Sequence, residues 1–547
     1  MKKLPRKQVK TDVLCIGGGP AGMMAAIRAA DAGCKVTVAE KGNTLHSGSG
    51  TGGNDHFQCY IPEFHGTDSK SVMEEFVHAP VAPQRFEFGK PWIEHSYEIV
   101  KMWDSWGIPM KYKGQWEFAG HAFPGRPRIF LKYTGGNQKR VMTEQALKRE
   151  VQIFNRAPVF ELLKEKGRVI GALAFDTWND QIIEFQAKAV FLGTGGCARL
   201  FPPSTPAWMF NLPFCPVLTG DGRAMMLRAG GELVNMEMTG RWAGPKYFAR
   251  AGKSTWIGVY RTPDDKPVGP FITKPDRLYG DITADAFTSM YDDYLQSGKG
   301  PVYQDCRGAS DEDIEYMIHW LRNEGNEGLV RHMEEEGIDP RRHAIEFRTY
   351  EIGVSGGTYF TVKGETSLPG LFCAGDEFGG GMAAAAIFGW LAGETAAKYA
   401  KQASLGSTEE AKDMIEERAV LLETMLNRNV GASWKESNIA TQQILSEYGG
   451  LTRSESILDQ GLRNLGRLKD KAYKTLMANN GHELGRCLEA LNLLDVGEAV
   501  MLSAMERKET RGRHNRMDYP FTNPLLDKLL VIKMVKGKPV FSWKELG

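Results

Sequence analysis

Residues 12–22, DVLCIGGGPAG, join an apolar run to a cluster of glycines near the start of the chain. The apolar run predicts a buried strand, and Pro20–Ala30, with small residues on one face, predicts a helix. Gly17 permits a tight turn, Gly19 lets the backbone approach a pyrophosphate, and Gly22 lets helix and strand pack closely. The start of the predicted helix then faces the phosphates of a bound ligand.

A second strand is predicted at 35–40, KVTVAE, where apolar and polar residues alternate. Glu40 ends this strand and is placed to accept hydrogen bonds from ribose hydroxyls. The sequence therefore predicts a βαβ unit that binds a dinucleotide. The pairs Pro20-Ala21 and Glu40-Lys41 favour FAD over NAD.

Length and charge exclude several classes of protein. The chain has 547 residues, 68 Lys+Arg against 67 Asp+Glu, and a mean hydropathy of −0.35. This near-neutral balance indicates no nucleic-acid partner, and the longest apolar runs, such as 189–193, are too short to span a membrane. The basic first ten residues are not followed by an apolar segment with a cleavage site, so we expect no secretory signal.

The cysteines indicate neither a metal site nor a disulfide framework. No two of them form a CxxC pair, so we predict no zinc or iron–sulfur ligands in this chain and no metal. A reducing, cytoplasmic compartment is the expectation. The eight cysteines are Cys15, Cys34, Cys59, Cys197, Cys215, Cys306, Cys373 and Cys487.

Composition shifts divide the chain into five segments. Glycine-rich stretches lie in the first and third, the second is rich in aromatic, proline and charged residues, the fourth has a helical period, and the last is basic without a strong period. The predicted segments are 1–240 and 350–405, two parts of an FAD-binding domain; 241–349, an inserted capping domain; 406–510, a helical domain; and 511–547, a tail.

Two further segments each combine a strand with glycine. GTGG at 193–196 follows a predicted strand at 182–192, and LFCAGD at 371–376 ends in Asp376. Such segments recur in flavoproteins of the two-dinucleotide-binding-domain type, where the acid binds the ribityl chain. The predicted fold is α/β, with a Rossmann-like FAD-binding domain, an inserted α+β capping domain and a C-terminal helical domain.

Taken together, these motifs resemble one superfamily over nearly the whole chain. GGGPAG, the glycines after His46, GTGG, TGDG at 219–222, GLFCAGD and ETRGRHNRMDYP at 509–520 follow its order. It comprises the flavoprotein subunits of succinate dehydrogenase, fumarate reductase and aspartate oxidase, and the alpha subunit of adenylylsulfate (APS) reductase. His46 to Tyr60 and Asp376 to Lys398 are most similar to the APS reductase alpha subunit.

The resemblance implies FAD as the cofactor, and two registers stay open at His46. Counting back from Gly52 places His46 where succinate dehydrogenase attaches FAD covalently. Matching Ser47-Gly48 to APS reductase shifts the register by one and matches more flanking residues, so we expect non-covalent FAD. The residues expected to contact it are Gly17, Gly19, Pro20, Ala21, Gly22, Glu40, Lys41, His46, Ser47, Gly48, Thr51, Gly52, Gly53, Thr194, Gly195, Asp221, Asp376 and Ala392.

The sequence departs from the dicarboxylate enzymes where they bind substrate. Ile352, Ala383 and Ile387 occupy the positions of two histidines and an arginine that hold carboxylates in those relatives, and their RGEGG loop is missing. Unpaired buried carboxylates are costly, so succinate and fumarate are not expected as substrates. The run 381–388 is also apolar where APS reductase has polar groups. Either substrate contacts come from elsewhere, or the pocket is remodelled for a less polar substrate.

Candidate catalytic residues lie in the predicted capping domain and just after it. Basic and aromatic residues there could stabilise an anionic substrate or reduced flavin, and Tyr350 could donate a proton. Equally, such a run forms solvated faces or subunit interfaces, and a tyrosine can be a core residue. The candidates are Arg241, Trp242, Lys246 and Tyr350, with Tyr247, Arg250 and Arg261 nearby.

The sequence thus predicts the FAD-bearing alpha subunit of an electron-transfer enzyme, which exchanges two electrons with a small substrate at flavin N5. By resemblance, we expect a ferredoxin-like iron–sulfur partner. Three alternatives remain: APS reductase itself, an ene-reductase or dehydrogenase for an apolar activated alkene, and a non-catalytic electron relay.

Overall fold

The largest sheet lies in the FAD-binding domain. The computed structural model describes residues 3–51, 54–78, 85–120, 122–205, 209–248, 255–286 and 288–546, and within them this sheet has seven strands in the order β5-β2-β1-β8-β7-β6, with β15 also paired to β8. β1 runs parallel to β2 and β8, whereas β7 is antiparallel to both neighbours. The strands are β1 (Arg6–Ile16), β2 (Val36–Ala39), β5 (Gln152–Phe154), β6 (Val159–Glu165), β7 (Arg168–Asp176), β8 (Gln181–Leu192) and β15 (Leu371–Cys373).

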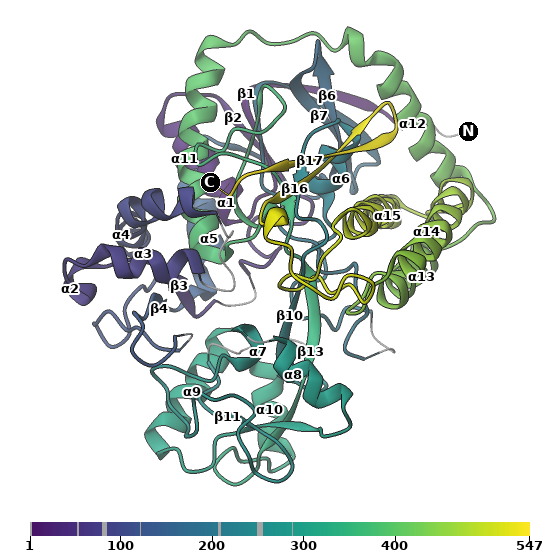
Figure 1. Cartoon of the computed structure of the whole chain (residues 1–547). Helices are drawn as coiled ribbons and strands as arrows, with labels where there is room; N and C mark the ends of the chain where they lie inside the picture. Colours follow the sequence, from purple (N-terminus) through teal and green to yellow (C-terminus); the bar gives the residue numbers. More distant parts are fainter. Residues whose placement is uncertain are drawn as a thin grey trace.

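Two helices rich in small residues pack together on this sheet. They are α1 (Pro20–Asp31) and α11 (Gly381–Gln402), and their contact is among the most extensive between helices (Figure 1). A Cβ on Gly389 would lie 2.5 Å from the carbonyl oxygen of Ala21, so only glycine allows this approach. The fold class predicted from the sequence is confirmed.

The inserted segment leaves the FAD-binding domain along one strand and returns along its antiparallel neighbour. β10 (Thr239–Pro245) and β13 (Ile345–Val354) pair side by side and connect the two lobes (Figure 1). Beyond them lie β11 (Val259–Arg261), β12 (Val302–Asp305), α7 (Thr283–Ala286), α8 (Thr288–Gln296), α9 (Asp311–Asn323) and α10 (Glu327–Glu335).

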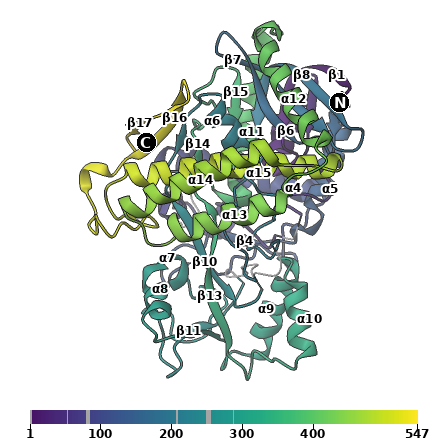
Figure 2. The same cartoon turned by 90° about the vertical axis from the view of Figure 1, so that its right-hand side faces the viewer.

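Helices dominate the segment that follows α11. α13, α14 and α15 lie side by side across the molecule (Figure 2), and this packing agrees with the predicted C-terminal helical domain. The helices are α12 (Lys412–Asn427), α13 (Trp434–Tyr448), α14 (Glu455–Thr475) and α15 (Gly481–Glu506).

The aromatic region after the first glycine segments contains regular elements. Here α4 buries Trp92, Ser96, Ile99 and Trp103 at helical spacing. The elements here are α2 (Pro62–His65), α3 (Ser69–His78), α4 (Gly89–Trp106), and the paired strands β3 (His56–Gln58) and β4 (Phe130–Lys132).

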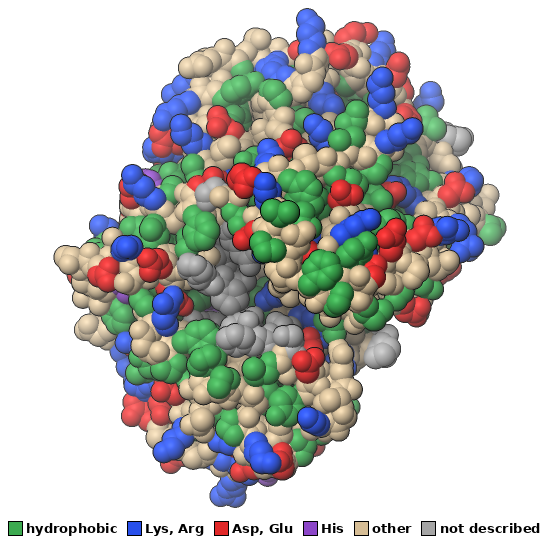
Figure 3. Space-filling view, in the orientation of Figure 1, with side chains coloured by type: hydrophobic (Ala, Val, Ile, Leu, Met, Phe, Trp, Pro, Cys, Tyr) green, Lys and Arg blue, Asp and Glu red, His purple; other side chains and the backbone are tan. Residues whose placement is uncertain are grey.

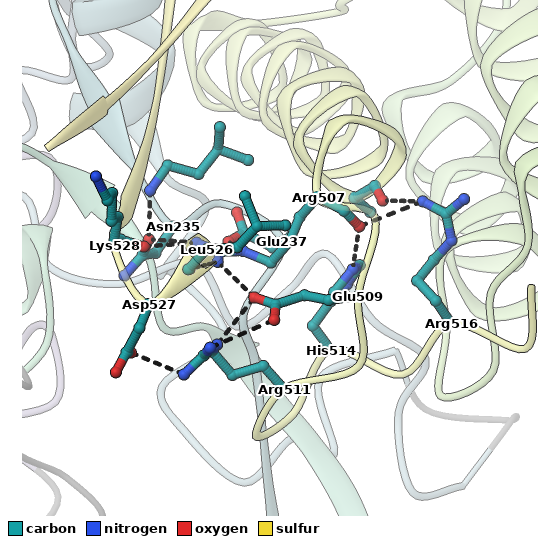
Figure 4. Close-up of polar contacts among 12 residues, drawn as sticks. Asn235, Glu237, Arg507, Glu509, Arg511, His514, Arg516, Leu526, Asp527 and Lys528 are labelled. Carbon is teal, nitrogen blue, oxygen red and sulfur yellow. Dashed lines mark hydrogen bonds and ion pairs between the residues drawn. The ribbon is translucent and has the colours of Figure 1, made fainter. Parts of the chain in front are cut away.

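The tail also has a structure that its sequence did not predict. β16 (Leu529–Val535) and β17 (Lys538–Lys544) form a hairpin, and β16 pairs with β9 (Leu233–Val234), which also pairs with β14 (Gly357–Thr358). Arg507, Glu509 and Arg511 anchor the loop before this hairpin through hydrogen bonds (Figure 4). The tail is therefore part of the FAD-binding domain's second sheet rather than a loose extension.

The remaining elements connect these parts. On the face shown in Figure 3, basic and acidic side chains are interspersed, in keeping with the near-zero net charge. In the described ranges, no helix combines the length and hydropathy needed to cross a membrane. The elements are α5 (Gln138–Leu147), α6 (Asp221–Arg228), and the 3₁₀ helices η1 (Phe86–Phe88), η2 (Gly135–Asn137), η3 (Gly375–Glu377), η4 (Glu409–Ala411) and η5 (Pro524–Leu526).

Candidate functional site

The turn between β1 and α1 is packed so tightly that side chains cannot fit there. Gly17 has a φ of +97°, and a Cβ on it would lie 2.4 Å from the carbonyl oxygen of Gly193. A Cβ on Gly22 would lie 1.8 Å from the carbonyl oxygen of Gly17. The turn therefore brings the start of α1 against the end of β8, and bare backbone faces the space above them.

That space is a cleft of about 880 Å³, part of it open to solvent. It is lined by the β1–α1 turn, the end of β2, residues 47–50, the end of β8, the start of α6 and the start of α11. Twelve of the residues predicted to contact FAD line it: Gly17, Gly19, Pro20, Ala21, Glu40, Lys41, Ser47, Gly48, Thr194, Gly195, Asp221 and Asp376.

Glu40 stands at the end of β2 and is buried. Its Oε2 accepts a hydrogen bond from the Gly18 N–H at 2.6 Å, and its Oε1 accepts one from the Gly42 N–H at 2.7 Å. The carboxylate is thereby fixed against the glycine turn at the edge of the cleft. This is where a ribose would meet it in a Rossmann-like site.

Lys41 and Asp221 form an ion pair on the cleft wall. Lys41 Nζ lies 2.7 Å from Asp221 Oδ2 and 2.9 Å from Glu489 Oε1, and Asn492 Nδ2 donates to the other Asp221 oxygen at 2.8 Å. Burial acts to lower the pKa of Lys41, but the two carboxylates outweigh it and raise that pKa. Because Glu489 and Asn492 belong to α15, the C-terminal helical domain completes this wall.

Arg223 ties together three chain segments around the cleft, and the sequence analysis missed it. Its guanidinium is buried and donates to the carbonyl oxygens of Gly195, Gly356 and Asp376 at 2.8–2.9 Å. Nearby, the Glu377 carboxylate accepts a hydrogen bond from the Thr194 N–H at 2.7 Å, and burial raises the pKa of Glu377. The only signal for Arg223 was its position directly after the TGDG motif.

The start of α11 closes one end of the cleft with backbone and apolar atoms. Gly379, Gly380 and Gly381 all have positive φ, and the Gly381 N–H donates to Asp376 Oδ1 at 3.1 Å. Met382 and Ala385 line the cleft beyond them. Ala383 and Ile387, at the positions where relatives carry substrate-binding side chains, are instead buried in the core.

Four of the described residues predicted to contact FAD do not line the cleft. Gly22 lies beneath the turn, His46 is exposed, and Thr51 Oγ1 donates to the Ser47 carbonyl at 3.0 Å. Ala392 is buried in the middle of α11 under Gly364. Gly52 and Gly53 lie outside the described residues.

The predicted catalytic residues lie together on the β10–β13 pair and do not line the cleft. Arg241 Nη1 lies 2.5 Å from Glu351 Oε1, and Lys246 Nζ lies 2.8 Å from Glu346 Oε1. The Tyr350 hydroxyl donates to the Lys246 carbonyl at 2.5 Å, and Trp242 packs edge-on against Phe214. Of the nearby candidates, Arg261 forms an ion pair with Asp305 and Tyr247 is exposed. Arg250 lies outside the described residues.

One group in the described residues has metal-ligating side chains. Oxygen and nitrogen atoms of Asp55, His56 and Glu324 lie within 4.8 Å of one another. However, Lys132 Nζ already lies 2.5 Å from Asp55 Oδ2, and the Thr255 hydroxyl donates to the same oxygen at 2.7 Å. A cation is thus already present in this group, and we assign no metal to it.

Comparisons with known proteins place these observations in a family. Residues 12–386 match the family described as FAD binding domain, and 439–534 match the one described as fumarate reductase flavoprotein C-term. The chain is 24% identical to one subunit of the fumarate reductase (CoM/CoB) of Methanothermobacter marburgensis, over 97% of this chain and 98% of that one. It is 25% identical to the fumarate reductase flavoprotein subunit of Mycobacterium tuberculosis, over 93% and 92%.

Solved structures share the fold. FrdA of Escherichia coli quinol fumarate reductase superposes with a TM-score of 0.85 at 20% identity, covering 98% of this chain and 97% of that one. Adenylylsulfate reductase of Archaeoglobus fulgidus gives 0.85 at 20% identity, covering 100% and 97%. The glycine turn, Glu40 and the backbone-lined cleft fit an FAD molecule, so the donor set of this chain agrees with the cofactor of its relatives.

Proposed function

This chain belongs to the FAD-binding family of fumarate reductase flavoproteins, and on that premise we propose that it is the flavin-bearing subunit of an electron-transfer complex. It is an FAD-dependent oxidoreductase. The observation that carries the proposal is the cleft in which twelve predicted residues converge above the β1–α1 turn. Bound FAD supplies two-electron chemistry there, and the chain's own residues hold the cofactor and exclude water from it.

We propose that FAD is bound without a covalent link. His46 is exposed and does not line the cleft, whereas the neighbouring Ser47 and Gly48 do. After acid precipitation of the purified protein, we expect all flavin absorbance in the supernatant. Flavin that stays with the precipitated chain, together with its loss in a His46→Ala variant, would contradict this.

The substrate that we propose is less charged than a dicarboxylate. Ile352, Ala383 and Ile387 are apolar, and the last two are buried at the start of α11, so none of these three side chains offers a cation. Two buried carboxylates without counter-charges would be strongly disfavoured there. The dicarboxylates of the fumarate reductase relatives therefore suit this site less well than a substrate without two carboxylates.

For the partner, we propose a separate iron–sulfur protein. All eight cysteines of this chain are free, and most are buried, which also fits the reducing, cytoplasmic compartment expected from the sequence. Several relatives are named as subunits, so a complex agrees with the family.

One experiment tests the complex and the substrate together. The protein is purified anaerobically from its native host, co-purifying chains are identified by mass spectrometry, and ferricyanide reduction is assayed with sulfite and AMP. An iron–sulfur chain with a blank assay is the expected result. A positive assay would instead identify an APS reductase, and a lone flavoprotein would overturn the complex and favour the ene-reductase.

A further inference from the structure

Lys139 is a buried cation that ends beside the cofactor turn. It lies in the first turn of α5, is 2% exposed, and its Nζ donates to the carbonyl oxygen of Gly18. A Cβ on Gly50 would lie 3.0 Å from Pro20 Cγ and 3.4 Å from Lys139 Cδ, so the lysine stem passes beside the first residue of α1. Its ammonium thus lies at the turn that precedes α1.

The charge of Lys139 lacks the compensation that other cations at the cleft have. Lys41 is paired with two carboxylates, and Arg223 lies 3.9 Å from Glu377. Within the described ranges, the ammonium of Lys139 has a hydrogen bond only to the neutral Gly18 carbonyl, and no carboxylate forms an ion pair with it. Burial lowers the pKa of Lys139, and the more distant Glu40 only partly opposes this. A buried charge in this state is costly, and a counter-charge would favour the charged form of the lysine.

An anionic ligand at the turn would supply that counter-charge. The first N–H groups of α1 have no partner within the helix and carry partial positive charge, which favours a phosphate. Lys139 adds a full charge at the same end. It also donates to the Gly18 carbonyl, while Glu40 accepts the Gly18 N–H, so the two peptide groups that flank the Gly18 Cα are both fixed.

We propose that Lys139 is a cofactor-positioning residue that balances the diphosphate of FAD and orients the Gly18 carbonyl. The inference rests on FAD binding alone and does not depend on the substrate or the partner of the proposed complex. It predicts that the charge of residue 139 matters for ligands that carry phosphate and not for the flavin ring itself.

The test compares FAD with riboflavin, which lacks phosphate, in titrations of the flavin-free protein followed by flavin fluorescence. Lys139→Met and Lys139→Gln should bind FAD about tenfold or more weakly, the size expected for losing a charge-assisted hydrogen bond, and riboflavin as the natural protein does. Lys139→Gln can still donate to Gly18, so it separates charge from hydrogen bonding. Lys148→Met, on the exposed last turn of the same helix, is the matched control and should leave both ligands unaffected.

Three results would overturn the proposal. They are unchanged FAD affinity in Lys139→Met, equal losses for FAD and riboflavin, and a Lys139→Gln variant that binds FAD normally. Where a neutral variant cannot be isolated without flavin, the rate of FAD release from the loaded protein into concentrated bromide replaces the titration. Lys139→Arg should then release FAD more slowly than Lys139→Gln, and equal rates would also count against the role of charge.

Discussion

Buried charged side chains lie both beside the cofactor cleft and where the tail is anchored, but their partners differ. Just before the tail, Arg507 donates to Glu237 at 2.6 Å and to Glu509 at 2.9 Å, and its other N–H groups donate to backbone carbonyls and to the Asn235 side chain (Figure 4). At the cleft, glycine backbone forms much of the wall, and beside it the ammonium of Lys139 has only a neutral partner among the described residues. The balanced charge of Arg507 joins parts of the chain, whereas we infer that the charge of Lys139 is balanced by a ligand.

Substitution within the glycine turn should have the largest effect. In Gly22→Ala, the new Cβ would lie 1.8 Å from the Gly17 carbonyl oxygen, so α1 must move away from β1. We expect the purified variant to carry no FAD, as measured by visible absorbance per chain. Gly136→Ala is the control because a Cβ there meets nothing within 4 Å. Full FAD content in Gly22→Ala would show that the turn does not hold the cofactor.

Removing Arg241 should affect stability rather than the cofactor. Arg241→Met leaves the buried Asp292 without its cation, at a cost of about 3–5 kcal/mol in the free energy of unfolding. Burial already raises the pKa of Asp292 despite Arg241. Asp292 therefore binds a proton more readily in the folded state than in the unfolded state. The loss of stability in Arg241→Met should become smaller as the pH falls toward the pKa of Asp292.

Urea unfolding at several pH values measures this deficit, with FAD content as the second readout. Arg241→Lys keeps a cation and should recover part of the loss. A stable, FAD-loaded Arg241→Met protein that has lost activity would instead make Arg241 a catalytic residue.

His514 in the tail should make stability depend on pH. Burial, followed by the charge of Arg453, lowers its pKa to about 2. Below about pH 6.5 the histidine binds a proton in the unfolded chain but not in the folded chain. The free energy of unfolding therefore decreases as the pH is lowered, and this group accounts for a decrease of about 2 kcal/mol at pH 5. Unfolding of His514→Gln should lack that part of the slope even if its stability at pH 7 is lower. An unchanged slope would assign the acid sensitivity to other groups.

Lys246 should give the smallest effect. In the part of the chain that the structure describes, its ammonium forms an ion pair with Glu346, and both side chains are about one-third exposed, so water replaces the contact readily. We expect Lys246→Met and Glu346→Gln to melt at the temperature of the natural protein and to keep their FAD. A clear loss of stability in Lys246→Met would mean that the ion pair stabilises the fold more than hydration of the two separate groups would.

Local backbone requirements explain what the sequence could predict. The turn requires glycines because a Cβ on Gly17 or Gly22 would meet backbone atoms at the end of the neighbouring strand or a few residues away. Glu40 is the residue that comes directly after β2, so its position was also predictable. These motifs carry their geometry within a short stretch of chain.

Features made by distant segments could not be predicted in this way. Arg223 reads as one more charged residue in a helix, and its three carbonyl partners come from separate parts of the chain. Lys139 likewise becomes notable only once α5 packs beside the turn. The tail hairpin had a local signal that was overlooked: Lys536 and Gly537, both with positive φ, form its turn between two runs rich in β-branched and aromatic residues.

The ion pair between Lys41 and Glu489 has a consequence for how the protein is made. At roughly 5–20 residues per second, the ribosome adds Glu489 roughly 20–90 s after Lys41. Until then α15 has not been made, so the cleft lacks the wall that this helix completes. β16, the strand that pairs with β9, has not been made either. We therefore expect the complete cleft to form only after α15 has been made, and the unfinished cleft to stay exposed on the nascent chain until then.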